Sequence, residues 1–190
     1  DGLYTLILRG QVDGKPSKDE RIIQSVKRGL SPYEDFEGYL ALAHNPDMRI
    51  IISNTTEAGI VYTGKDSFDD KPQASYPGKL TRLLYERFTA LGGKKGTGFI
   101  LLPCELIDYN GRNLEECCMK TAEQWGLSEE FKTWLKTENV FCSTLVDRIV
   151  TGYPRGEAES LYEEFGYRDN MLDTAEPFGL WVIEGPAWIE

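Results

Sequence analysis

The feature that most constrains this chain is a repeated order of short apolar runs, polar turn segments and amphipathic stretches. Residues 48–53 and 99–103 are continuous apolar runs bounded by turn residues. Such runs are typical of strands that are fully buried in a parallel sheet. Between them, residues 79–91 place apolar side chains at the spacing of a helix that buries one face. This order predicts an α/β fold with a mainly parallel sheet and helices on its faces.

Local signals predict further elements along the chain. Ser17 and Glu20 have the spacing of a capping box, in which the two side chains satisfy the first turn of a helix, and they predict a helix over residues 18–28. Residues 63–76 are polar and predict a long loop. The other predicted elements are strands at 4–9, 140–150 and 178–183 and helices at 33–43, 113–125, 128–137 and 157–165.

The charge balance excludes several classes of partner. The 190 residues carry 21 Lys and Arg against 31 Asp and Glu, for a formal net charge of -10. Non-specific nucleic-acid binding and anionic membranes both require a basic surface, so neither a nucleic acid nor a membrane is expected as a partner. No apolar run approaches the roughly 20 residues that cross a bilayer.

Cysteine and histidine usage argues against a metal centre. The four cysteines include no CxxC pair, and the single histidine, His44, follows a predicted helix, where we expect a structural role. Reduced thiols in a cytoplasmic protein are the simplest interpretation. Cys104 adjoins a strand end, but nothing beside it in the sequence would activate it as a nucleophile.

Two polar segments follow the two apolar runs, where α/β sheets bind ligands. Residues 53–59 combine hydroxyls, an amide and a carboxylate, which suit a ribose or a sugar; a helix cap with a solvated acid is the alternative. In residues 103–111, the amide of Asn110 can donate to a carbonyl oxygen that gains charge during reduction. The pattern alone favours the alternative, a type I′-like turn at Asn110 and Gly111.

Two other motifs leave alternatives open. Asp147 and Arg148 lie in apolar sequence, where a charged pair needs partners if it is buried. They fit either a structural ion pair or a polar network behind a site. Residues 92–98 are rich in Gly and Lys but lack the ending of a phosphate-binding loop and precede a strand, so we interpret them as a plain loop.

Three segments, in order, resemble the mannitol dehydrogenase family of polyol-type long-chain dehydrogenases. They are Ser53-Asn-Thr-Thr-Glu-Ala-Gly59, Pro103-Cys-Glu-Leu-Ile-Asp-Tyr-Asn-Gly111 and Phe141-Cys-Ser-Thr-Leu-Val-Asp-Arg-Ile149. Residues 75–84 and 151–155 are similar to those of members that act on hexuronates. The resemblance implies a metal-free hydride transfer that uses NAD and interconverts a keto sugar acid and its hydroxy acid.

The resemblance also implies a partial Rossmann-like nucleotide-binding domain. Residues 1–177 would be the later part of that domain, and residues 178–190 a strand and the start of a junction to a helical C-terminal domain. Both ends of the sequence lie in or next to apolar segments, so we expect a fragment of a longer protein. We further expect the fragment alone to be inactive, to bind NAD weakly and to self-associate through exposed apolar surface.

Residue roles follow from the same resemblance. Asn54, Thr55, Thr56 and Glu57 would lie beside the nicotinamide end of the cofactor. The other assignments are Asn110 as the donor that stabilises the alkoxide, Asp147 and Arg148 near the substrate, and Lys79 as a contact to the substrate carboxylate.

One departure from the family bears on Asn110. Most polyol members have Cys-Asp-Asn where this chain has Cys104, Glu105 and Leu106. If the oxyanion-binding Asn is the one in that triplet, Leu106 replaces it. The alternatives for function are a sibling that acts on fructuronate or mannitol and, in another class, a non-catalytic α/β binding domain.

Overall fold

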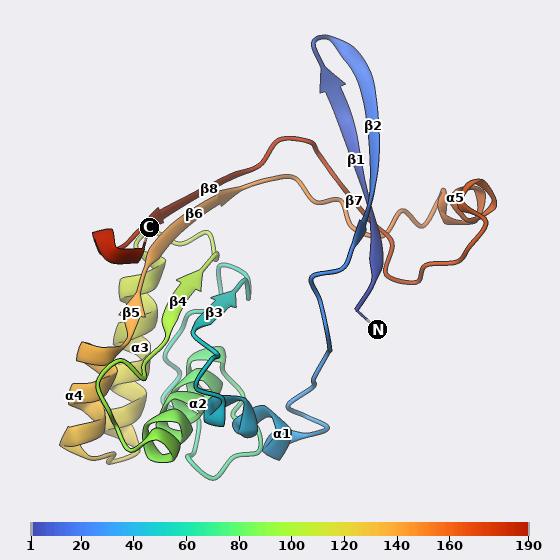
Figure 1. Cartoon of the computed structure of the whole chain (residues 1–190). Coiled ribbons are helices and arrows are strands. Elements are labelled where there is room, and N and C mark those ends of the chain that lie inside the picture. Colours follow the sequence, from blue (N-terminus) through green and yellow to red (C-terminus); the bar gives the residue numbers. More distant parts are fainter. Residues whose placement is uncertain (1, 190) are drawn as a thin grey trace. The chain divides into compact units, whose positions relative to one another are not determined.

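A computed structural model describes residues 2–189 of the chain. The chain divides into two compact units (Figure 1). One unit comprises the residues up to Gly29 together with Asp147–Leu180, and the other comprises Leu30–Val146 together with the residues from Trp181 onward. The boundary at residue 177 between a nucleotide-binding domain and a junction stays a prediction.

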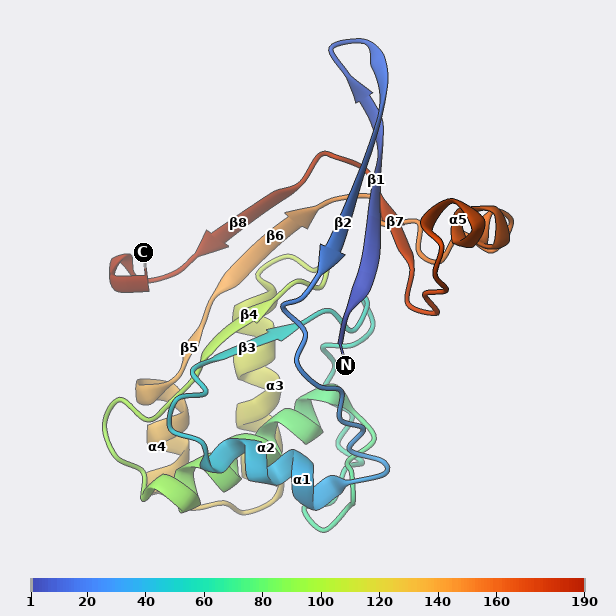
Figure 2. The ribbon, with the colours of Figure 1, turned by 45° about the vertical axis from the view of Figure 1, so that its right-hand side comes forward.

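The second unit contains a parallel sheet with helices packed against it. The sheet has the order β3-β4-β5, and the register pairs Ile50 with Ile100 and Ile100 with Val140. Helices α2, α3 and α4 lie along the sheet, as Figure 2 shows. This confirms the predicted α/β class. The elements are α1 (Phe36–Ala41), η1 (Leu42–His44), β3 (Ile50–Ser53), α2 (Tyr76–Leu91), β4 (Ile100–Pro103), α3 (Asn110–Gln124), α4 (Glu129–Glu138) and β5 (Val140–Phe141).

Side-chain caps fix the starts of these helices. Ser75 accepts a hydrogen bond from the backbone N–H of Gly78 at 3.0 Å, so α2 begins at Tyr76, earlier than the apolar spacing predicts. Ser128 caps α4 in the same way, through the N–H of Phe131 at 3.2 Å, as predicted. Asp35 caps the short helix α1, which is therefore shorter than the predicted helix over residues 33–43.

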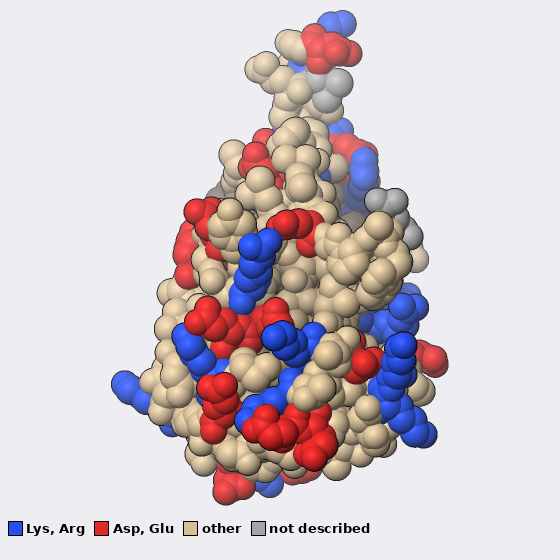
Figure 3. All heavy atoms as spheres, turned by 90° about the vertical axis from the view of Figure 1, so that its left-hand side faces the viewer, with Lys and Arg blue, Asp and Glu red and all other residues tan. Residues whose placement is uncertain are grey.

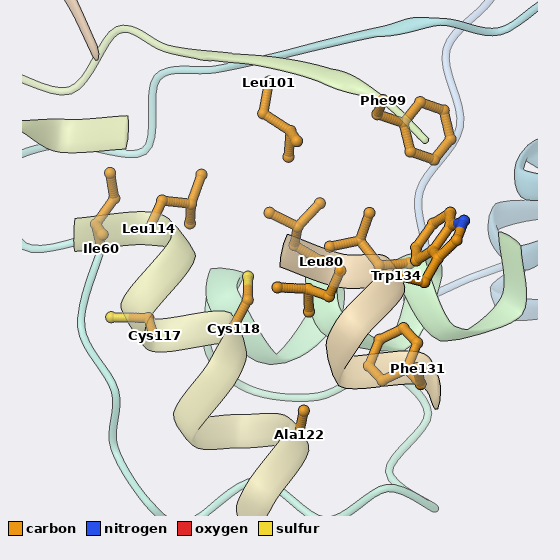
Figure 4. Packing of buried hydrophobic residues seen from close by; sticks show 12 residues of the cluster. Ile60, Leu80, Phe99, Leu101, Leu114, Cys117, Cys118, Ala122, Phe131 and Trp134 are labelled. Carbon is orange, nitrogen blue, oxygen red and sulfur yellow. The ribbon is translucent and has the colours of Figure 1, made fainter. Parts of the chain in front are cut away.

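The main hydrophobic core lies between the parallel sheet and its helices. Figure 4 shows Phe99 and Leu101 pointing toward side chains of α2, α3 and α4. The opposite face of β3 is open, because Ile50 and Ile52 are 52% and 58% exposed. The expectation that residues 48–53 are fully buried is therefore wrong. β3 is an edge strand, and no described element of its own unit covers its second face.

The first unit is built around a hairpin. Strand β1 (Tyr4–Val12) pairs antiparallel with β2 (Lys15–Ile23) and parallel with β7 (Asp173–Ala175), and helix α5 (Ala158–Phe165) contributes to a small core around Ile7. The predicted helix over residues 18–28 is wrong. Asp13 and Gly14 both have positive φ, 53° and 73°, which makes a two-residue hairpin turn. Pairing with β1 outweighs the local capping signal.

The predicted strand at 140–150 is divided in two. β5 belongs to the parallel sheet, whereas β6 (Ser143–Asp147) pairs with β8 (Leu180–Glu184) in a separate two-stranded sheet. Four consecutive apolar residues of β8, from Leu180 to Ile183, are 41–50% exposed. The short helix η2 (Ala187–Ile189) follows.

The charge of the surface and the length and apolarity of the helices limit which partners are possible. On the face drawn in Figure 3, acidic and basic side chains are interspersed, and no patch of one sign covers it. That face therefore offers no basic patch that would attract an anionic ligand over a long range. Among the described residues, none of the helices combines the length and the apolarity that crossing a membrane requires.

Candidate active site

A buried carboxylate links the segments that follow β3 and β4. Glu105 comes just after β4 and is 1% exposed. Its Oε2 accepts from the Ser53 hydroxyl at 3.0 Å, and its Oε1 accepts from the Thr55 backbone N–H at 3.0 Å and the Thr55 hydroxyl at 2.8 Å. The carboxyl ends of two neighbouring parallel strands are therefore held together by one side chain.

A buried amide extends this network to β6. Asn110 has no exposed surface, and its Nδ2 donates to the carbonyl oxygens of Pro103, Glu105 and Thr144 at 3.0, 2.9 and 2.9 Å. Its Oδ1 accepts from the Thr144 N–H at 2.9 Å. The two amide hydrogens already serve three acceptors. The role of Asn110 as a donor to an alkoxide stays a prediction, and it requires one of these bonds to open.

The backbone around Asn110 corrects two local expectations. Asn110 is the first residue of α3, so the predicted turn at Asn110 and Gly111 is wrong, and the helix begins before Asn113. The turn is made by Tyr109, which has φ 54°. A Cβ on Gly111 would lie 2.3 Å from the carbonyl oxygen of Cys142. The Asn-Gly pair therefore allows α3 to approach the end of β5 closely, which local turn statistics do not reveal.

The predicted cofactor-binding residues divide into two groups. Thr55 is half-buried and held by Glu105, whereas Asn54, Thr56 and Glu57 are exposed. Thr56 has φ 77°, which is uncommon for a β-branched residue. Its carbonyl accepts from the Gly59 N–H at 3.0 Å, which closes a tight turn. The segment thus presents an amide, a hydroxyl and a carboxylate at the carboxyl edge of the sheet.

The predicted substrate contacts Asp147 and Arg148 lie in the other unit. The Nε and Nη2 atoms of Arg148 donate to the carbonyl oxygen of Glu176, both at 3.1 Å, and the carboxylate of Glu176 accepts from the Ile149 N–H at 2.6 Å. Within the described range no ion pair joins Asp147 to Arg148. The alternative of a structural ion pair between Asp147 and Arg148 is therefore not seen in the described residues. Arg148 instead joins its own segment to the backbone at Glu176.

Lys79 lies in the first turn of α2, as expected. Its Nζ donates to the carbonyl oxygen of Ala74 at 2.9 Å and lies 5.2 Å from the centre of the Tyr33 ring. Both partners of the ammonium group, Ala74 and Tyr33, belong to the same unit as Lys79. A contact of Lys79 with a substrate carboxylate stays a prediction.

The remaining reactive side chains have structural surroundings. All four cysteines are free and buried, and burial raises the pKa of the Cys104 thiol, so it is not an activated nucleophile. His44 ends η1 with its Nε2 2.8 Å from Oε1 of Glu86, in keeping with its expected structural role. Glu105 is the residue that sequence reasoning missed. Its only signal was a carboxylate directly after a buried strand, beside the departure from Cys-Asp-Asn.

Parallel strands covered by helices, with polar segments at the carboxyl edge, define a Rossmann-type domain. The family model described as the mannitol dehydrogenase Rossmann domain matches residues 3–189. The chain belongs to the mannitol dehydrogenase family.

Relatives with known names agree with this assignment. The chain is 57% identical to an altronate oxidoreductase of Shigella flexneri and 56% identical to that of Enterobacter sp. (strain 638), in both cases over 98% of the chain. It spans 39% of the length of these relatives.

Solved structures show the same fold. Pseudomonas fluorescens mannitol 2-dehydrogenase, in a ternary complex with NAD and D-mannitol, has a TM-score of 0.77 and 22% identity, covering 96% of this chain and 38% of that one. A D-sorbitol dehydrogenase in substrate-free form has a TM-score of 0.79 and 22% identity, covering 95% of this chain and 38% of that one.

Proposed function

We propose that this chain is part of an NAD-dependent oxidoreductase that interconverts tagaturonate and altronate by hydride transfer, in cytoplasmic hexuronate catabolism. The observation that carries the proposal is the identity of 55–57% to altronate oxidoreductases over at least 98% of the chain. The choice of NAD is supported by the ternary complex of the structural neighbour, which holds that cofactor.

The polar segment after β3 fits the nicotinamide-ribose end of NAD. Asn54, Thr56 and Glu57 are exposed at the edge of the sheet where doubly wound folds bind ligands. An amide, a hydroxyl and a carboxylate together can donate to and accept from ribose hydroxyls. We assign these three side chains to cofactor contact, and Thr55 to the support of the segment.

The reaction sets what the chain must do. NADH, when bound, supplies the hydride that reduces the keto carbon of tagaturonate. The carbonyl oxygen then carries the electron pair of the broken π bond and takes up a proton to become the altronate hydroxyl. A donor aimed at that oxygen lowers the barrier. Asn110 remains our candidate for this donor, and its present bonds also give it the task of joining β4 to β6.

Asp147, Arg148 and Lys79 are the proposed substrate contacts. The exposed carboxylate of Asp147 can accept from a sugar hydroxyl. Arg148 and Lys79 would have to exchange a backbone carbonyl for the substrate carboxylate. Changing Lys79→Ala in the full-length enzyme tests this role, because a substrate contact predicts a higher KM for tagaturonate. An unaltered KM would remove Lys79 from the site.

The proposed function is tested by offering tagaturonate, fructuronate and fructose to the full-length enzyme and following NADH absorbance. Selective oxidation of NADH with tagaturonate is the expected result. Preference for fructuronate or fructose would keep the hydride-transfer mechanism and replace the substrate. Absence of turnover with all three would favour a non-catalytic binding domain.

A further inference from the structure

Glu105 is a buried acid that lacks a cationic partner. In the part of the chain that the structure describes, no Lys, Arg or His forms an ion pair with it. Burying a carboxylate without a counter-charge is unfavourable unless hydrogen bonds replace the lost water. Three donors do so here, and all three belong to Ser53 and Thr55. The hydrogen bonds that offset the burial of Glu105 therefore all come from one short segment.

The contacts of Glu105 alternate along that segment. Ser53 and Thr55 bond to the buried carboxylate, while the intervening Asn54 and the following Thr56 are exposed. Because Ser53 and Thr55 are held by Glu105, the directions of the exposed side chains of Asn54 and Thr56 are fixed as well. From Ser53 to Thr55 the alternation matches the two-residue period of a strand, and the positive φ of Thr56 then turns the backbone away from it.

A strained residue and a close contact show how firmly the segment is held. Thr56 keeps φ 77°, a conformation that persists only where neighbouring contacts impose it. On the other side, a Cβ on Gly59 would lie 1.9 Å from the Thr55 hydroxyl oxygen. Thr55 is thus confined between Glu105 and Gly59. These contacts restrict the conformations open to the segment at the carboxyl edge of the sheet.

We propose that Glu105 is a positioning residue for the cofactor: through Ser53 and Thr55 it holds Asn54 and Thr56 in the geometry that binds the nicotinamide ribose. The inference rests on the proposed function, because it takes NADH as the ligand of this edge. Glu105 itself is 1% exposed and bonded to the segment, so we expect it to make no direct contact with the cofactor. Its effect is on the affinity for cofactor, with no direct part in hydride transfer.

The chemistry of the side chain distinguishes hydrogen bonding from charge. In Glu105→Gln, the amide oxygen can still accept from Thr55, and the Ser53 hydroxyl can rotate to accept from the new N–H. In Glu105→Ala, all three donors lose their acceptor. Positioning by hydrogen bonds therefore predicts that Gln rescues most of the cofactor affinity that Ala loses.

The experiment is a calorimetric titration of NADH into the full-length protein and its variants, together with thermal unfolding. Glu105→Ala is expected to raise the Kd for NADH about tenfold or more, and Glu105→Gln about threefold or less. At saturating NADH, the KM for tagaturonate should change little in either variant. This split between cofactor and substrate would not arise from general loss of structure.

Asn139→Ala is the matched control. Asn139 is also buried and makes three hydrogen bonds, to the Phe99 N–H and to the carbonyls of Trp134 and Leu135, but at the opposite edge of the sheet. It should lower the melting temperature as Glu105→Ala does and leave the Kd for NADH unchanged. Equal effects of the two variants on the Kd would overturn the proposal.

Two milder variants keep the test decisive if Glu105→Ala does not fold. Ser53→Ala and Thr55→Val each remove one hydroxyl donor and keep the carboxylate. Each should raise the Kd for NADH several-fold, with effects that are less than additive when combined with Glu105→Gln. Unchanged affinity in both would contradict the proposal. If the unmodified protein binds no NADH, the proposed function fails first, and the two failures remain distinguishable.

Discussion

Buried side chains of opposite charge lie at the two ends of the parallel strands, which are called here the amino edge and the carboxyl edge. At the amino edge, the guanidinium of Arg87 is 1% exposed and donates only to backbone carbonyls. At the carboxyl edge, the carboxylate of Glu105 accepts from one N–H and two hydroxyls. The acceptors of Arg87 are the carbonyl oxygens of Ala43, Asn45, Pro46, Met48 and Thr97.

A buried asparagine accompanies each charged group. Asn139 joins the segment before β4 to the end of α4, whereas Asn110 joins the ends of β4 and β6. The edges differ in what they leave exposed. Arg87 closes the segments that enter β3 and β4, while the Glu105 network leaves Asn54 and the strained Thr56 open to solvent. We therefore expect the amino edge to serve stability and the carboxyl edge to serve the proposed binding of cofactor.

The largest effect is expected from Arg87→Met. The change leaves five backbone carbonyls without their donor, which should destabilise the protein by about 3 to 5 kcal/mol. Thermal unfolding of the full-length protein measures the loss. The fraction that remains folded should bind NADH with unchanged Kd. A variant as stable as the parent, or one with weakened NADH binding, would break the proposed division between the edges.

The two asparagines offer a paired test. Asn110→Ala and Asn139→Ala each leave buried backbone groups unsatisfied and should cost about 2 to 3 kcal/mol. Only Asn110→Ala should also reduce turnover of tagaturonate, because its bonds organise the carboxyl edge. Thermal unfolding and initial rates on the same preparations separate the two effects. Equal loss of turnover in both variants would contradict the proposed division of stability and binding between the two edges.

A smaller effect is expected from relieving strain at Thr56. Glycine adopts φ 77° without the steric cost that a β-branched side chain incurs. Relief of about 1 to 3 kcal/mol of strain is partly offset by the freer unfolded chain that glycine allows, so Thr56→Gly should stabilise the protein by about 1 kcal/mol while it weakens NADH binding. Melting temperature and calorimetric Kd are the measurements. Loss of stability would indicate that the hydroxyl of Thr56 supports the fold.

The smallest effect concerns an acid that lies at neither edge. Asp66 is buried, which by itself raises its pKa, but hydrogen bonds from Ser75 and Ala74 outweigh burial and lower the pKa below its ordinary value of 3.8. A lowered folded-state pKa gives stability above the unfolded value that is lost as the pH falls through the folded value.

The melting temperature of the parent should therefore fall more steeply below about pH 4 than that of Asp66→Asn. NADH affinity at neutral pH should be the same in both proteins. Parallel acid profiles would remove Asp66 from the account of stability.

The sequence predicted those elements whose signals are local and strong. The apolar runs became β3 and β4, and the spacing of leucines became α2. The capping box at Ser17 and Glu20 gave a wrong prediction, because it indicates only the conformation that the isolated segment prefers. In the folded chain, pairing with β1 supplies the backbone hydrogen bonds of a strand instead. The turn expected at Asn110 failed for a related reason, since its amide binds Thr144, 34 residues away.

The sequence by itself determined the class of fold and the family, and it predicted the segments at which a ligand would bind. Those inferences rest on periodicity and on ordered motifs, which a linear chain displays directly. Only the tertiary structure decided which polar side chains are available to a ligand and which hold the backbone. Glu105 and Asn54 are equally polar in the sequence, yet one is buried among donors and the other faces water. Burial and hydrogen-bond partners depend on neighbours that the fold brings from distant positions.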